Sequence, residues 1–229
     1  MISLAIDTST KNCSVGLFNG DSLIDSINFE GDGYVHSEKL FDFISDLCSK
    51  NQISTSSIKH FFISNGPGSY TGLRIGASAI KGMAYANKGK VYCLSSLEVL
   101  FWQGLQEAKE LDCSFIASMI DARRDEVYLG FYDLSGNLIE EEKAVIIDEN
   151  FFDRFTDRVL LVGDGTPKFH ERFNHLSNYH WSKETINKVN SLGSIIEKRI
   201  KENSHDDLAY FEPNYIKSYQ PGKKKKLFS

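Results

Sequence analysis

An internal repeat places the strongest constraint on the fold of this chain. Residues 5–18, AIDTSTKNCSVGLF, align with residues 119–132, MIDARRDEVYLGFY. In each copy an apolar run ends in an aspartate, Asp7 or Asp121, and nine residues later a glycine lies inside a second apolar run. Two short apolar runs joined by polar residues are typical of paired strands. The repeat therefore predicts two halves built on one plan.

The order of the later segments extends this repeat. In each copy a tight turn follows the second strand, a third strand follows the turn, and an apolar strand later runs into a glycine turn. The expected third strands are residues 23–29 and 138–147, and the later strands are residues 61–64 and 159–162. Apolar residues at helical spacing predict helices over residues 37–49, 73–86, 97–111 and 184–202, whereas residues 166–183 show no clear period.

Three antiparallel strands followed by helix, strand and helix, in duplicate, resemble the actin-like ATPase (ribonuclease H-like) fold. We therefore expect an α/β protein with two βββαβα-type lobes. The first lobe is expected at residues 1–110 and includes dimerisation helices; a degenerate second lobe is expected at residues 111–217. A basic flexible tail is expected at residues 218–229.

A glycine-rich turn is the most distinctive local motif. Residues 65–76 read NGPGSYTGLRIG, after an apolar run and before a helix rich in small residues. Strand, glycine turn and helix is an arrangement that directs backbone N–H groups at an anion or at another chain. The turn lacks the Lys-Ser or Lys-Thr pair of a Walker A loop. Ser69 is not within a Gly-x-Ser-x-Gly motif, so we favour a helix-capping role over a hydrolase nucleophile.

Charge and composition limit the classes of function. The 229 residues carry a net charge of −5, although four lysines stand together at Lys223–Lys226. The rest of the chain is thus more acidic still, which opposes an independent RNA-binding protein. The lysine run is either a solvated tail or a weak contact for RNA or an acidic partner. Four unpaired cysteines and the lack of a leader or membrane-spanning run predict a soluble, cytoplasmic protein without membrane contact.

The resemblance to actin-like ATPases suggests where a nucleotide would bind. In that superfamily the phosphates lie between two Asp-ended hairpins, and here Asp7, Thr8, Ser9 and Thr10 are candidates for a vestigial nucleotide-binding site. The second hairpin has two arginines and no glycine after its aspartate, so half of the expected phosphate clamp is missing. No two of the six histidines lie three or four residues apart, so local spacing assembles no metal site. We predict no catalytic residue.

Two helices of the first half are more apolar than contact with one sheet requires. The apolar residues of 37–49, which include Phe41, cover an arc of roughly 160°, against about 100° for a sheet-facing stripe. Small residues share one face of the helix that follows the glycine turn, which favours close approach of another helix. Burial within this chain remains the alternative. The candidate partner-interface residues are Leu40, Phe43, Leu47, Gly72, Gly76, Ala79 and Met83.

Four motifs resemble those of the TsaB (YeaZ) family. The glycine turn is similar to GPGSFTGLRIG with Tyr70 for Phe, and residues 36–40, HSEKL, are similar to HSExL. Residues 120–128, IDARRDEVY, are similar to IDARRGEVY with Asp125 for Gly. Residues 213–217, PNYIK, are similar to PxYxR with Lys217 for Arg.

This resemblance implies a non-catalytic subunit that is needed for the N6-threonylcarbamoyladenosine modification of adenosine 37 in tRNA. It implies pairing with the transferase TsaD or with a second copy, through the first-half helices, and binding of TsaE at the junction. The complex, rather than this chain alone, would contact tRNA, and ATP or ADP and metal are expected only there. The alternative is a degenerate actin-like kinase or a peptidase-like hydrolase that acts alone.

Overall fold

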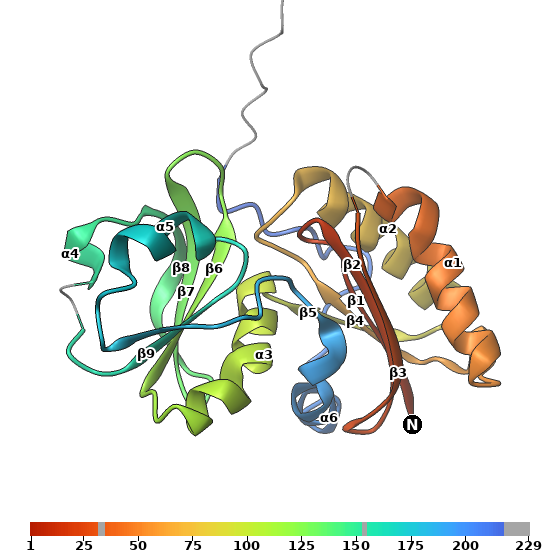
Figure 1. The fold of residues 1–229 in the computed structure, drawn as a ribbon. Coiled ribbons are helices and arrows are strands. Elements are labelled where there is room, and N and C mark those ends of the chain that lie inside the picture. Colours follow the sequence, from red (N-terminus) through yellow and green to blue (C-terminus); the bar gives the residue numbers. More distant parts are fainter. Residues whose placement is uncertain (32–34, 153–154, 218–229) are drawn as a thin grey trace, which may run out of the picture.

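The computed structural model describes residues 1–31, 35–152 and 155–217 and contains two five-stranded sheets (Figure 1). The first has the order β3-β2-β1-β4-β5, with β1 (Ile2–Asp7), β2 (Asn12–Asn19), β3 (Ser22–Glu30), β4 (His60–Ser64) and β5 (Lys90–Leu94). The second has the order β10-β9-β6-β7-β8, with β6 (Phe115–Asp121), β7 (Glu126–Asp133), β8 (Leu138–Ile146), β9 (Val159–Val162) and β10 (Tyr179–Trp181).

The two sheets share one topology, which confirms the predicted duplication and the α/β fold class. In the first sheet β1, β2 and β3 pair antiparallel, and β4 and β5 extend the sheet in parallel. In the second sheet β6, β7 and β8 pair antiparallel, and β9 and β10 extend it in parallel. The registers of the two hairpins differ by one residue, because Asp7 pairs with Ser14 and Asp121 pairs with Val127, whereas the repeat aligns Ser14 with Tyr128.

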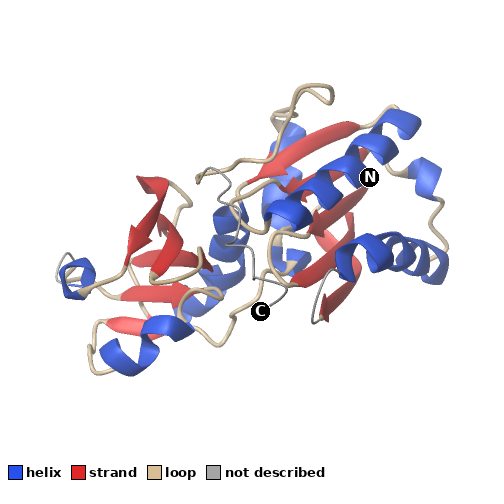
Figure 2. Cartoon of the chain, turned by 90° about the horizontal axis from the view of Figure 1, so that it is seen from above, coloured by secondary structure: helices blue, strands red, loops and turns tan. Residues whose placement is uncertain are grey.

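The helices form three layers around the sheets. They are α1 (Val35–Lys50), α2 (Tyr70–Asn87), α3 (Ser96–Glu110), α4 (Glu149–Phe152), α5 (Pro167–Phe173) and α6 (Gly193–Lys201), with short 3₁₀ turns η1 (Thr55–Ser57) and η2 (Val189–Ser191). Figure 1 shows α1 and α2 outside the first sheet, α4 and α5 beside the second, and α3 and α6 between the sheets. From above, the two groups of strands are separate, with helices between them (Figure 2).

Apolar side chains join each helix layer to its sheet. Leu40, Ile44 and Leu47 of α1 and Ile80 of α2 are buried against the first sheet. The core of the second sheet is rich in phenylalanine, with Phe151, Phe152, Phe169 and Phe173 buried. Each fully buried aliphatic or aromatic side chain of this size contributes about 1.5–3 kcal/mol relative to exposure. These cores fix the helices from which the site residues project.

Three of the predicted helices are confirmed, as α1, α2 and α3, but the prediction for residues 184–202 was wrong in its first half. The helix α6 begins only at Gly193, because residues 182–190 are bonded through backbone and side-chain groups to both halves of the molecule. The expectation of irregular structure at 166–183 was also wrong. Helix α5 begins with a proline at its first turn, and β10 pairs in parallel with β9.

The end of the described chain returns to the first sheet. Val189, Leu192, Ile195 and Ile196 are buried together with Phe18 of β2 and other side chains of that sheet. A bridge between Val91 and Asp206 continues this contact. The division into lobes at 1–110 and 111–217 remains a proposal, and the basic tail at 218–229 lies outside the described residues. No helix in the described part of the chain has both the length and the apolar composition needed to cross a membrane.

Candidate functional site

The glycine turn sets the start of α2 directly on the β1–β2 hairpin. The Ser69 N–H donates to the Ser9 carbonyl at 2.6 Å, and the Ser69 hydroxyl accepts from the Gly72 N–H at 3.3 Å. A Cβ atom on Gly68 would lie 2.2 Å from the Ser9 carbonyl oxygen, and one on Gly72 would lie 2.0 Å from the Thr8 carbonyl oxygen. Only glycine permits this contact. Ser69 is thus the N-cap of α2, as predicted.

Asp7 ends β1 beneath this turn and is fully buried. Its Oδ1 accepts from the Ser9 N–H at 2.8 Å and the Ser9 hydroxyl at 2.7 Å. Its Oδ2 accepts from the Ser64 hydroxyl at 2.5 Å and from Asn187 Nδ2 at 3.2 Å. Burial raises the pKa of Asp7 above its usual value, and these hydrogen bonds oppose that rise. The carboxylate is therefore held by the protein's own donors.

The rest of the first hairpin is closed in the same way. Thr8 donates to the Gly72 carbonyl at 2.9 Å, and Thr8, Ser9 and Thr10 are each at most 6% exposed. The vestigial nucleotide-binding site at residues 7–10 stays a prediction; in this structure the glycine turn and Asn187 pack on these residues. Among the side chains that the structure describes, no three His, Cys, Asp or Glu groups are placed to hold a metal ion.

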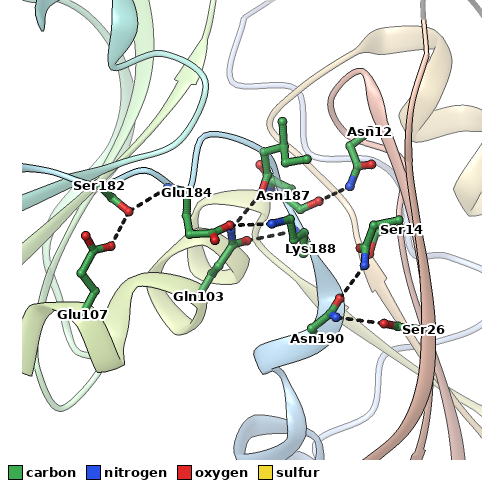
Figure 3. Close-up of polar contacts among 12 residues, drawn as sticks. Asn12, Ser14, Ser26, Gln103, Glu107, Ser182, Glu184, Asn187, Lys188 and Asn190 are labelled. Atoms are coloured by element: carbon green, nitrogen blue, oxygen red, sulfur yellow. Dashed lines mark hydrogen bonds and ion pairs between the residues drawn. The ribbon is translucent and has the colours of Figure 1, made fainter.

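Residues 182–190, here called the interlobe segment, bond to both halves of the molecule (Figure 3). On the side of α3, Gln103 Nε2 donates to Glu184 at 2.8 Å and to the Ile186 carbonyl at 3.0 Å, and Gln103 Oε1 accepts from the Lys188 N–H at 3.0 Å. Ser182 donates to Glu107 at 2.5 Å. These bonds attach the segment to α3, which packs on the second sheet.

On the side of the first sheet, the same segment bonds to β2 and β3. Asn12 Nδ2 donates to the Asn187 carbonyl at 2.6 Å, and the Val189 N–H donates to Ser14 Oγ at 3.0 Å. Asn190 Nδ2 donates to Ser26 Oγ at 2.9 Å. A polar seam of this kind holds the two lobes in one arrangement, since unpaired buried groups would cost about 1–3 kcal/mol each.

The second Asp-ended hairpin differs from the first because its loop is exposed. Asp121 Oδ1 accepts from the Arg123 N–H at 2.6 Å and from Lys168 Nζ at 2.5 Å. Arg123 and Arg124 of this loop are exposed to solvent. The Asp121 N–H donates to Asp164 at 2.8 Å, and burial raises the pKa of Asp164 to about 6.

A shallow groove of about 580 Å³ lies on the outer face of α1 and α2. Phe41 on α1 is 56% exposed, and Arg74 on α2 places its guanidinium 4.0 Å from the centre of the Tyr70 ring. Exposed apolar surface rimmed by polar groups is typical of protein–protein contact sites. The groove is lined by Phe41, Tyr70, Thr71, Arg74, Ile75, Ser78 and Ala79.

Of the seven predicted interface residues, only Ala79 lines this groove. Leu40 and Leu47 are core residues, and Phe43 and Met83 are partly buried against the same core. Gly72 and Gly76 face inward, since a Cβ atom on Gly76 would lie 2.4 Å from Thr8 Oγ1. The two glycines thus contact the β1–β2 hairpin, and their part in a partner interface stays a prediction. The side chains of His36 and Ser37, in the HSEKL motif, lie outside the described residues.

Sequence reasoning missed Phe41, Tyr70, Arg74 and Ile75 as groove residues. The broad apolar arc of the first helix contained the signal, because Phe41 lies at one side of it. Which side of the arc faces the sheet depends on the packing of Leu40, Ile44 and Leu47, and the sequence pattern alone does not specify this.

Comparisons with known proteins find relatives that are named for the threonylcarbamoyl modification of tRNA. The family model for TsaD, tRNA N6-adenosine threonylcarbamoyltransferase, matches residues 34–224. The tRNA threonylcarbamoyladenosine biosynthesis protein TsaB of Escherichia coli K12 is 31% identical over 71% of this chain and 71% of its own length. TsaB of Bacillus subtilis 168 is 31% identical over 66% of this chain, and the match spans 62% of the B. subtilis protein. The solved structure of YeaZ from Pseudomonas aeruginosa superposes with a TM-score of 0.80 at 25% identity, covering 93% of this chain and 99% of that one.

Proposed function

The chain belongs to the TsaB family, and we propose that it serves tRNA threonylcarbamoyladenosine biosynthesis as the non-catalytic partner of the transferase TsaD. In this proposal the α1–α2 groove binds a helix of the partner, and TsaE joins at the junction. A second copy of the chain is an alternative occupant of the same face. ATP or ADP and any metal act in the partner complex.

The exposed ring of Phe41 carries this proposal. A phenylalanine buries roughly 200 Å² when it is fully covered, so a ring that is 56% exposed offers roughly 100 Å² to a partner. At about 25 cal/mol per Å², covering it would contribute about 2.5 kcal/mol. The half-buried Ile75 extends the apolar surface, the buried Ala79 lies at the base of the groove, and Arg74 and Ser78 supply a polar rim. A groove with an aromatic anchor and a polar rim suits a packed helix.

The closed first hairpin supports a non-catalytic role over a kinase-like enzyme that acts alone. Gly68 and Gly72 lie directly against the backbone of residues 8 and 9, and both oxygens of Asp7 accept hydrogen bonds from the protein's own donors. Ser69 accepts the capping hydrogen bond of α2, and this favours a structural role over that of a hydrolase nucleophile. The partner TsaD, rather than this chain, would supply the transferase site.

The test is reconstitution of the modification with purified components. TsaD, TsaE, tRNA and an enzyme that makes threonylcarbamoyl-adenylate are combined with or without this chain, and modified nucleosides are measured by mass spectrometry. We expect modification to require the chain and to be lost with Phe41→Arg. Ile146→Arg is the matched control, because Ile146 is 63% exposed on β8, away from the groove. Full modification without the chain, or ATP turnover by the isolated chain, would contradict the proposal.

A further inference from the structure

A continuous row of cationic and aromatic side chains runs from α2 to the β6–β7 hairpin. At the α2 end, the Tyr70 and Tyr215 rings lie 4.8 Å apart between centroids. Arg74 lies over the Tyr70 ring and donates from Nε to the Tyr215 hydroxyl at 3.2 Å. Arg74 and Tyr215 are both exposed. Flat, exposed groups of this kind are surfaces on which nucleobases stack.

Lys217 continues the row to the second half of the molecule. It follows Tyr215 by two residues, and its ammonium group bonds to Glu126 and contacts the Ala122 carbonyl oxygen at 3.5 Å. Lys168 bonds to the other side of the same hairpin, at 2.8 Å from the Arg124 carbonyl oxygen. We call this set the cation–aromatic strip: Lys11, Tyr70, Arg74, Arg123, Arg124, Lys168, Tyr215 and Lys217.

The charge balance of the strip leaves arginines available for a ligand. Asp121 is bonded to Lys168 and Glu126 to Lys217, while Asp164 lies partly buried beneath and attracts Lys11. Asp125 is exposed in the same loop. Within residues 1–31, 35–152 and 155–217, Arg123 and Arg124 form no ion pair with a carboxylate, whereas Arg74 is held by Tyr70 and Tyr215.

The backbone of the hairpin gives an independent reason to assign a role to Arg123 and Arg124. Their φ angles are +67° and +54°, a left-handed conformation that residues with a Cβ atom adopt at a cost. Turns with two such residues favour Asn-Gly, which would relieve this strain. Strained residues of this kind are concentrated at binding sites. Arg123 and Arg124 thus occupy positions at which this turn favours Asn-Gly, and their side chains are exposed to solvent.

We propose that the cation–aromatic strip contacts an RNA strand, with Arg123 and Arg124 on phosphates and with Tyr215 against a base. Guanidinium groups bind phosphate oxygens through paired hydrogen bonds. This rests on the proposed function, in which tRNA is the substrate of the complex. Because the remainder of the chain is acidic, we expect the isolated chain to bind RNA weakly and a partner protein to supply further RNA contacts.

The test uses a double substitution that removes both charges and suits the turn, Arg123→Asn with Arg124→Gly. The matched control is Lys198→Ala with Lys201→Ala, two exposed cations of α6, which lies at the opposite end of the molecule from the β6–β7 hairpin (Figure 1). Each variant is measured alone and in complex with TsaD. A tRNA transcript is the probe, and chloride is varied from 50 to 200 mM. Co-elution with TsaD is recorded for the same samples.

We expect the hairpin variant to remain folded, with an unchanged or higher melting temperature, and to bind tRNA more weakly. Loss of two phosphate contacts should lower the slope of log affinity against log salt by about 1.4, taking about 0.7 per contact with a single strand. The loss of tRNA affinity in the hairpin variant, relative to the wild type, should thus be about sevenfold larger at 50 mM than at 200 mM salt. The control should follow the wild type. Tyr215→Ala should lower tRNA affinity at least about fivefold at either salt concentration.

An unchanged salt slope in an intact TsaD complex would overturn the inference. So would a hairpin variant that loses TsaD but keeps the tRNA affinity of the isolated wild-type chain, because the strip would then bind an acidic protein surface. Displacement of tRNA by ATP at equal ionic strength in the wild type but not in the variant would also overturn it. If the wild-type chain does not co-elute with TsaD, the proposed function fails. The inference about the strip is then tested on the isolated chains, by comparing the tRNA affinities of the wild type and the hairpin variant at 50 mM salt.

Discussion

Replacing Asn187 by alanine should destabilise the protein by breaking the polar seam between its halves. Asn187 is fully buried, and its Nδ2 donates to Asp7 at 3.2 Å and to the Ser96 carbonyl at 2.9 Å. The substitution removes one hydrogen-bond donor from each of two buried acceptors, Asp7 Oδ2 and the Ser96 carbonyl, and each loss costs about 1–3 kcal/mol. Asn187 Oδ1 has no partner within the described structure, so its removal returns part of this cost. We expect a net loss of about 2–3 kcal/mol in the free energy of unfolding.

Thermal unfolding measures this loss directly. For a chain of 150–250 residues each kcal/mol lowers the melting temperature by about 2–4 °C, so Asn187→Ala should lower it by roughly 5–10 °C. Asn174→Ala is the control, because Asn174 is exposed at the end of α5. If the two variants melted at the same temperature, the seam would contribute nothing to stability, and our account of residues 182–190 would be refuted.

Three further outcomes are expected. Gly72→Ala should lower the free energy of unfolding by about 3 kcal/mol or more, because its Cβ atom would meet the Thr8 carbonyl oxygen at 2.0 Å. Gly82 lies in the same helix with open space around it, so Gly82→Ala should raise the free energy of unfolding by about 0.5–1 kcal/mol. Equal denaturant midpoints for the Gly72→Ala and Gly82→Ala variants would contradict the packing described. Asp164 has a pKa of about 6 in the folded state, above the ordinary value of 3.8, so the folded state binds more protons between pH 4 and 6 and loses stability as pH rises through that window. Asp164→Asn should therefore raise the melting temperature at pH 8, by the equivalent of about 1–3 kcal/mol in the free energy of unfolding, and should have no such effect near pH 4. An increase of the same size at both pH values would exclude titration of Asp164 as its cause. The isolated chain should not hydrolyse ATP above the rate of a heat-denatured sample, and steady phosphate release would support the kinase alternative.

Local patterns were sufficient to predict the duplicated hairpins and the first three helices. Asp7 and Asp121 each end the first strand of a hairpin, because each apolar run has the length of a strand and stops at a polar residue. The start of α6 could not be predicted in this way. Residues 184–190 carry apolar side chains at helical spacing, but long-range hydrogen bonds to Gln103 and Ser14 keep them out of an α-helix. Tertiary contacts here outweigh local propensity.

The candidate site was predicted only in outline. The sequence indicated an excess of apolar surface on two helices, and the structure contains an exposed groove on them. Small residues at Gly72 and Gly76 suggested close approach by a partner, whereas the close approach is to the protein's own Thr8. A stripe of small residues predicts a close contact but does not identify the element that makes it.

Titration of TsaD into the purified chain tests the central claim most directly. Calorimetry with the wild type, Phe41→Arg and Ile146→Arg compares the groove with an equally exposed apolar position on the other sheet. Loss of about 2.5 kcal/mol of apolar burial corresponds to roughly 50–100-fold weaker binding by Phe41→Arg, with no change for Ile146→Arg. Equal affinity of all three chains for TsaD, or no binding by the wild type, would contradict the account.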